Sequence, residues 1–143
     1  SGPEARMADR VRRVPYWYFE VPDQPGEGAK LFEKLRDQKL NLLHFTAFPV
    51  GGGRSQVDVV PEDQAAFVEG VKRAGLRPVG PKEAFLVQGG DRPGAAAEVL
   101  RKLAGAKVNV IAANASAAQG GVFGMIVWVA PADLAAAARA LGA

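Results

Sequence analysis

The sequence predicts an α+β protein of two tandem ferredoxin-like (βαββαβ) units, each with an antiparallel sheet that carries its helices on one face. Three observations predict this fold. The chain has 143 residues, 48% hydrophobic and 23% charged, which suits one moderate core or two small ones. The sequence also repeats itself. Finally, each repeat alternates apolar runs typical of strands with stretches that have the spacing of a helix.

The repeat has an offset of 68 residues. This offset aligns the Asp-Xaa-Pro-Gly sequence at residues 23–26 with the one at residues 91–94, and Asn41 with Asn109. After the next hairpin the offset becomes 70, because Pro61 aligns with Pro131, so two extra residues are expected there. Internal duplication of this kind indicates two copies of one structural unit.

The first repeat begins with residues 14–21, which are rich in strand-forming residues and end at DQPGEG. The next helix should place Leu31, Phe32 and Leu35 on one face. LNLLHFTAF and RSQVDVV then flank PVGGG, whose glycines suit a hairpin. Pro61 should open the second helix, and LRPV can form a short closing strand.

The second repeat runs from KEAFLVQG through a helix with Val99, Leu100 and Leu103 facing inward, to the strands KVNVIAANAS and GVFGMIVWVA. Its last helix should begin at Pro131, and no sequence remains after it for a closing strand. The predicted units are therefore residues 14–80 and 81–143. The second unit would have an open sheet edge, which favours pairing with another chain.

An aromatic cluster, YWYF, lies in the first strand. Alternation along a strand places Tyr16 and Tyr18 on one face and Trp17 and Phe19 on the other. One pair should belong to the core, and the other should pack against a partner module.

The first thirteen residues are predicted to be a basic leader exposed to solvent. Arg6, Arg10, Arg12 and Arg13 lie there, whereas the whole chain has a net charge of only +3. Such a leader could also steer the chain toward nucleic acid or an acidic partner.

The composition argues against several kinds of protein. The chain has no cysteine and a single histidine, His44, so we expect no disulfide, thiol chemistry or metal site. No stretch approaches the roughly 18 consecutive apolar residues of a membrane helix, and the start lacks the apolar middle of a secretory signal. A cytoplasmic protein without a cofactor is expected.

The stretch QGGDRPGAAAEVL, residues 88–100, is the candidate functional site. Gly89 and Gly90 would allow close approach to the backbone, Asp91 would cap the following helix, and Pro93 would fit its first turn. The remaining free amides and the helix dipole would then bind a small anion such as an amino-acid carboxylate. Any helix start uses such residues, so a purely structural role is the alternative.

The repeated order, with GGDRPGAAAEVLRKLAGAKVNV at this turn, resembles the ACT domain family over nearly the whole chain after Arg13. The resemblance implies regulatory modules that pair through their sheets, and many of them bind amino acids between modules. It also implies ligand contacts from the loop and from an asparagine near the start of the second strand. The positions that match this pattern are Gly90, Asp91, Arg92, Pro93, Gly94 and Asn109, and in the first repeat Asp23, Gln24, Pro25, Gly26 and Asn41.

The second loop is the preferred site, because Val21 and Pro22 stand where it has Gly89 and Gly90 and make the first loop stiffer. The predicted function is that of a non-catalytic regulatory homodimer. It would bind a small amino acid between modules and transmit occupancy to a protein partner by altered module packing.

Two other functions stay open. One is a ligand-free module for dimerisation or protein interaction. The other is binding of single-stranded RNA on the open sheet face, because FGMIVW at residues 123–128 resembles a strand motif of RNA-recognition modules, although the strand lacks basic residues. Catalysis is not expected, since no nucleophile with a base, phosphate loop or converging carboxylates is visible, and His44 should be a packed or surface side chain.

Overall fold

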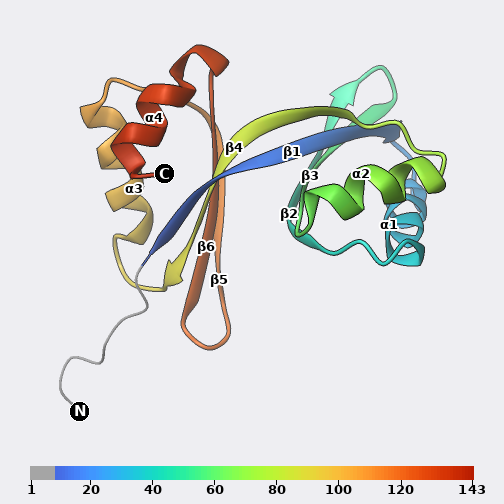
Figure 1. Ribbon diagram of the computed structural model, residues 1–143, viewed down its shortest axis with the longest axis horizontal. Coiled ribbons are helices and arrows are strands. Elements are labelled where there is room, and N and C mark those ends of the chain that lie inside the picture. Colours follow the sequence, from blue (N-terminus) through green and yellow to red (C-terminus); the bar gives the residue numbers. More distant parts are fainter. Residues whose placement is uncertain (1–8) are drawn as a thin grey trace. The chain divides into compact units, whose positions relative to one another are not determined.

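The computed structural model describes residues 9–143 (Figure 1). Its elements, in chain order, are β1 (Arg10–Pro22), α1 (Glu27–Asp37), β2 (Leu42–Gly51), β3 (Arg54–Pro61), α2 (Gln64–Arg73), β4 (Val79–Gly90), α3 (Ala95–Gly105), β5 (Val110–Ala118), β6 (Val122–Val129), η1 (Pro131–Asp133) and α4 (Leu134–Leu141). The six strands have the order β2-β3-β1-β4-β6-β5. The pairs β1–β3, β2–β3, β4–β6 and β5–β6 are antiparallel. The predicted α+β class is confirmed.

The chain forms two compact units. The central unit is Pro15–Lys82, and the terminal unit combines residues 9–14 with Glu83–Ala143. The division falls within β1 and β4, so each of these strands contributes one part to each unit. In the terminal unit the strands have the order β1-β4-β6-β5.

The expectation that residues 10–13 belong to a solvated leader is wrong, because β1 begins at Arg10. Val11 packs against the core of the terminal unit, and Arg12 donates a hydrogen bond of 3.0 Å to Gln88. Arg13 pairs with Glu83. β1 lies beside β4 in the sheet, so residues 10–14 take the place of the closing strand that was not evident in the second repeat. Residues 1–8 of the predicted leader lie outside the described residues.

Each unit has its own hydrophobic core between the sheet and two helices. In the central unit, the Phe67 ring lies 4.8 Å from that of Trp17 and 6.2 Å from that of Phe19. Trp17 and Phe19 are therefore the core pair of the aromatic cluster. In the terminal unit, α3 and α4 lie next to each other (Figure 1), and the core residues they cover include Phe85, Val99, Leu103, Phe123, Val127 and Leu141.

The internal repeat reappears in the backbone. The amide of Asp23 donates to the Gly53 carbonyl at 2.8 Å, and 68 residues later the amide of Asp91 donates to the Gly121 carbonyl at 2.8 Å. β3 and β6 also begin 68 residues apart, at Arg54 and Val122. The two extra residues therefore lie between β6 and α4, where the chain forms η1, and not in the hairpin.

Several predicted boundaries are wrong. LRPV does not close the first unit as a separate strand, because β4 runs without a break from Val79 to Gly90. Pro61 ends β3, and Asp63 caps α2 by accepting a hydrogen bond of 3.0 Å from the Ala66 amide. Leu100 is 41% exposed, so the inner face of α3 is formed by Ala95 together with Val99 and Leu103.

Candidate functional site

The end of β4 and the loop that joins it to α3 hold five of the six residues predicted to bind ligand in the second repeat. Gly94 is the N-cap of α3, with φ 86° and ψ 2°, and no side chain caps the helix. The predicted capping by Asp91 is therefore wrong, and Pro93 lies in the turn before the helix, not in its first turn. Position 94 needs a glycine, because its backbone is in the left-handed region, which residues with a side chain rarely adopt.

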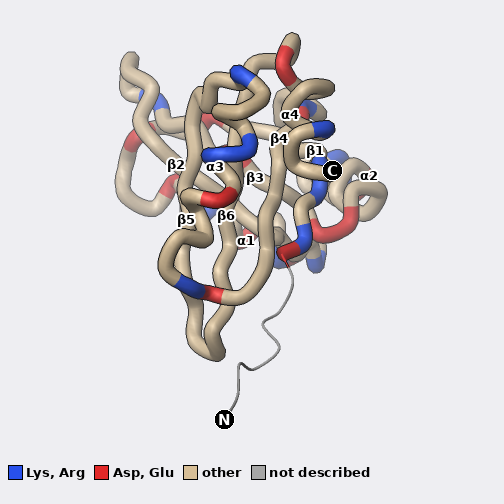
Figure 2. The backbone as a smooth tube through the Cα atoms, turned by 90° about the vertical axis from the view of Figure 1, so that its left-hand side faces the viewer, with Lys and Arg blue, Asp and Glu red and all other residues tan. Residues whose placement is uncertain are grey.

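Arg92 is the most constrained side chain of this loop. Its Nη1 and Nη2 donate to the two carboxylate oxygens of Asp9 at 3.1 and 2.9 Å, a bidentate pair. It also donates to the Gly90 carbonyl at 2.9 Å and to Glu98 at 2.5 Å. The two carboxylates hold the pKa of Arg92 further above its usual range, Asp9 more than Glu98. Figure 2 shows acidic and basic positions side by side where the chain turns from β4 into α3.

Gly89 makes the contact with Asp9 possible. A Cβ at this position would overlap Asp9 Oδ1 and lie 3.0 Å from the Asp9 Cα. The close approach predicted for Gly89 is therefore made by the protein's own Asp9.

The loop between β1 and α1 has the same backbone but different side chains. Gly26 is the N-cap of α1 with φ 88°, and again no side chain caps the helix. Asp23 accepts a hydrogen bond of 3.1 Å from the Ser55 hydroxyl. Gln24 occupies the position of Arg92, and its side chain has no hydrogen bond among the described residues. All four loop residues, Asp23, Gln24, Pro25 and Gly26, are exposed.

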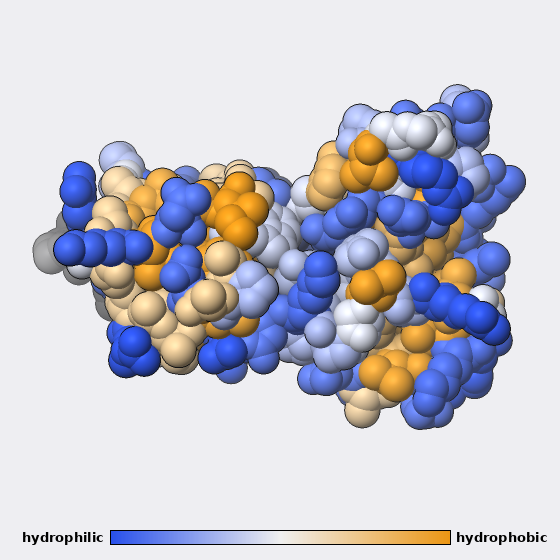
Figure 3. All heavy atoms as spheres, turned by 90° about the horizontal axis from the view of Figure 1, so that it is seen from above, coloured by the Kyte–Doolittle hydropathy of each residue, from blue (hydrophilic) through white to orange (hydrophobic). Residues whose placement is uncertain are grey.

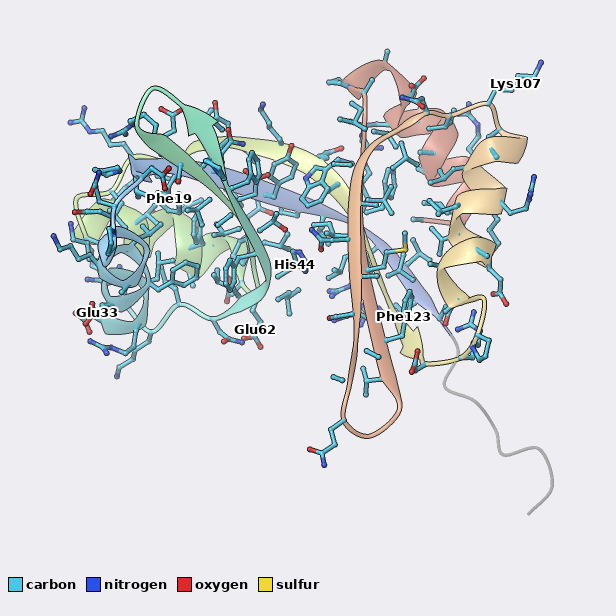
Figure 4. The ribbon with its side chains drawn as sticks, turned by 180° about the vertical axis from the view of Figure 1, so that it is seen from behind. Phe19, Glu33, His44, Glu62, Lys107 and Phe123 are labelled. Carbon is cyan, nitrogen blue, oxygen red and sulfur yellow. The ribbon has the colours of Figure 1, made fainter. Side chains whose placement is uncertain are left out.

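The two asparagines do not reach the loop of their own unit. Asn41 and Asn109 follow the C-terminal ends of α1 and α3, whereas the loops precede the N-terminal ends. Each helix has 11 residues, so the two positions are separated by a helix length of about 16 Å. Figure 4 shows Lys107, two residues before Asn109, at the far end of α3 from the loop.

The surroundings of the two asparagines also differ. The Asn41 amide donates to the Glu62 carboxylate at 2.7 Å, beside a surface hollow of about 670 Å³ near the start of α2. Lys39 and Asp63 also line this hollow. Asn109 is exposed, and its side chain makes no hydrogen bond among the described residues.

A polar group that the sequence analysis did not single out lies in the central unit, on the face of its sheet that carries no helices. Asp58 is buried there and accepts a hydrogen bond of 2.8 Å from Gln56. Burial raises the pKa of its carboxyl group, while the Gln56 hydrogen bond and Lys82 act in the opposite direction. His44 is half-buried, and its Nε2 lies 3.0 Å from the Thr46 hydroxyl. A lone aspartate in the strand RSQVDVV was the available sequence signal.

The described residues give no support to metal or RNA sites. In residues 9–143, no group of three or more His, Asp or Glu side chains could hold a metal ion. In the same range, no helix is long and apolar enough to cross a membrane. Phe123 and Met125, from the motif that suggested RNA binding, belong to the core of the terminal unit. Phe123 lies on the side of the sheet that faces α3 (Figure 4). Bases could not stack on Phe123 there.

The fold is similar to that of several solved structures. The sequence matches no protein-family model and no curated protein. The structure is similar to that of protein BT0572 from Bacteroides thetaiotaomicron, with a TM-score of 0.75, 14% identity, and coverage of 92% of this chain and 88% of that one. It is also similar to the regulatory subunit of aspartate kinase from Thermus thermophilus, with a TM-score of 0.59, 18% identity, and coverage of 96% and 95%.

A third similar structure is aspartate kinase from Synechocystis, with a TM-score of 0.58 and 20% identity. The match covers 95% of this chain but only 26% of that kinase. At these identities the likeness concerns the fold alone. What the likeness shows is an α+β fold with an antiparallel sheet, similar to that of the aspartate kinase regulatory subunit.

Proposed function

We propose that the chain is a non-catalytic regulatory protein of two tandem ferredoxin-like units that binds a small amino acid. The observation that carries this proposal is the repeated loop, in which Gly26 and Gly94 start α1 and α3 without a side-chain cap. The first amide of each helix, from Glu27 and Ala95, already donates to a loop carbonyl at 3.3 Å. The next two amides have no hydrogen bond among the described residues, so they are available to an anion, and the helix dipole favours a carboxylate there. The likeness to regulatory subunits of aspartate kinase supports the same function.

The loop at residues 23–26 is the better candidate for binding ligand. It is exposed, whereas Arg92 in the other loop is only 10% exposed and already pairs with Asp9. This reverses the preference derived from the flexibility of Gly89 and Gly90.

An asparagine that contacts this ligand has to come from outside the unit that supplies the loop, because a helix length separates the two. Asn109 is the better candidate, because its side chain is exposed, whereas the Asn41 side chain donates a hydrogen bond to Glu62. We therefore place the ligand between two copies of the chain, with the loop from one copy and Asn109 from the other. The regulated protein would respond to the change in packing between copies.

The sheet edges favour such a homodimer. β2 and β5 are the edge strands. β5 has nine residues, none charged and none proline, so it lacks the features that usually protect an edge from pairing. Ile111 on this strand is 61% exposed. Hydrophobic residues reach the surface as separate patches between hydrophilic ones in the view of Figure 3.

A thermal-shift screen of the twenty amino acids tests the proposal. A ligand at 100 times its dissociation constant stabilises the folded state by about 2.7 kcal/mol. We expect a response confined to one or two amino acids and lost in Gly26→Val, because the branched side chain does not adopt the backbone of this N-cap. The control is Ala29→Val, which adds the same side chain on an exposed position of α1.

A flat response from a folded, dimeric protein would favour the second candidate function, a ligand-free interaction module. The Asp9–Arg92 pair is the observation in its favour, because it shows one of the two loops bonded within the chain.

A further inference from the structure

The carboxylate of Asp9 lies where the carboxylate of a ligand would bind to Arg92. Asp9 lies directly before β1, and its two oxygens accept from Arg92 Nη1 and Nη2. A bidentate pair of this kind is the usual way in which a protein recognises a free carboxylate. Its side chain is only 20% exposed.

The fold does not need this pair to shape the loop. The loop at residues 23–26 makes the same backbone hydrogen bonds, with Gln24 in place of Arg92 and Lys30 in place of Glu98. Val21 stands there in place of Gly89, and a Cβ at Gly89 would overlap Asp9 Oδ1. Gly89 and Arg92 are therefore explained by the binding of Asp9 and not by the turn.

The donors of Arg92 are almost fully used. Its four terminal N–H groups have acceptors on Asp9, Gly90 and Glu98. Its buried Nε has no partner among the described residues. A free carboxylate can thus gain full pairing with Arg92 only by replacing Asp9 or Glu98. Glu98 is 53% exposed and bonds through one oxygen, whereas Asp9 has the bidentate place.

We propose that Asp9 is an internal competitor that occupies the carboxylate position of the 90–94 loop, and that a carboxylate ligand binds this loop only by displacing Asp9. Displacement would free the start of β1 from Arg92, so occupancy of the loop would be passed to the strand that joins both units. The identification of the ligand as an amino acid rests on the proposed function, whereas the carboxylate position itself does not.

Acetate is the probe, because its methyl group and carboxylate match the methylene group and carboxylate of an aspartate side chain. Amide and arginine Nε signals of the full chain are followed by NMR during titration with acetate at constant ionic strength. In Asp9→Ala we expect saturable shifts at residues 90–94 and at Arg92 Nε. The affinity should be at least about tenfold higher than in the wild type, which corresponds to about 1.4 kcal/mol.

Two controls make the result specific. Neutral acetamide should produce no saturable shift, since it lacks the charge that Arg92 requires. Glu98→Gln removes the other carboxylate on Arg92 but leaves Asp9 in place, so it should respond to acetate as weakly as the wild type does. The proposal is overturned if Asp9→Ala shows no saturable acetate response, or if the wild type binds acetate as tightly as the variant.

If Asp9→Ala does not fold, Arg92→Gln provides the second test, because it installs the residue found in the other loop. Amide hydrogen exchange at Val11 should then be faster than in the wild type, and an unchanged rate would overturn the proposal. An acetate response without any amino-acid response would leave this proposal standing and reject the amino-acid function. An amino-acid response at residues 23–26, with no acetate response in Asp9→Ala, would support the amino-acid function and overturn the proposal that Asp9 is a competitor.

Discussion

Replacing Gly94 by alanine should destabilise the protein through the backbone alone. Gly94 has φ 86°, and nothing lies within 4 Å of the place where a Cβ would be added. A left-handed conformation costs an L residue roughly 1–2 kcal/mol. Alanine also restricts the unfolded chain, which offsets about 0.4–1 kcal/mol of that cost. We therefore expect Gly94→Ala to lower the free energy of unfolding by about 1 kcal/mol.

The matched control is Gly28→Ala in the first turn of α1. Nothing lies within 4 Å of its added Cβ either, but Gly28 does not have a positive φ. Alanine there should raise the free energy of unfolding by about 0.5–1 kcal/mol, because it favours the helix. Urea denaturation at one pH measures both variants. The same glycine-to-alanine change should thus lower the free energy of unfolding at position 94 and raise it at position 28.

Gly94→Asn separates conformation from other effects of the substitution. Asparagine adopts the left-handed region more readily than alanine, so Gly94→Asn should lower the free energy of unfolding by less than Gly94→Ala does. Equal losses for Ala and Asn, or a Gly94→Ala protein as stable as the wild type, would refute the explanation by left-handed backbone.

Three further predictions follow from the described residues. Phe67→Ala should lower the free energy of unfolding by about 3–5 kcal/mol in urea denaturation, because the ring is fully buried against Trp17 and Phe19. Asp58→Asn should be more stable than the wild type at neutral pH. Burial raises the pKa of Asp58, so the folded wild type loses stability as the pH rises above 3.8, the ordinary pKa of an aspartate. The stability advantage of Asp58→Asn should therefore vanish below pH 3.8. An advantage that does not depend on pH would contradict this explanation. Ala115→Lys on β5 should yield a monomer in sedimentation if this edge pairs copies, whereas Ala104→Lys on the exposed side of α3 should not.

Local sequence patterns were sufficient to find the two loops but not their helix caps. The Asp-Xaa-Pro-Gly pattern at a fixed offset marks both loops, whereas the N-caps are the left-handed Gly26 and Gly94 and not the predicted Asp91. Strand alternation also separated Trp17 and Phe19 from Tyr16 and Tyr18, although only the structure shows that Trp17 and Phe19 are the core pair. These features depend on residues a few positions apart, which is the range over which turn chemistry and periodicity act.

The role of the first residues depends on partners far along the chain. Arg12 and Arg13 contact Gln88 and Glu83, which are 76 and 70 residues away. A short segment with three arginines has neither the length nor the apolar alternation that predicts a strand in isolation. It becomes a strand because β4 offers an edge and polar side chains that pair with these arginines, and no local pattern contains that information.

The same reasoning explains why the preferred loop changed. Two glycines before Asp91 indicate close approach to the backbone, and the structure has that approach at Gly89. The sequence could not show that the approaching group is Asp9, which precedes Arg92 by 83 residues. A duplicated loop can therefore keep one backbone in both copies while a single distant carboxylate distinguishes them. On this view the loop at residues 23–26 binds ligand directly, and the loop at residues 90–94 binds it in competition with Asp9.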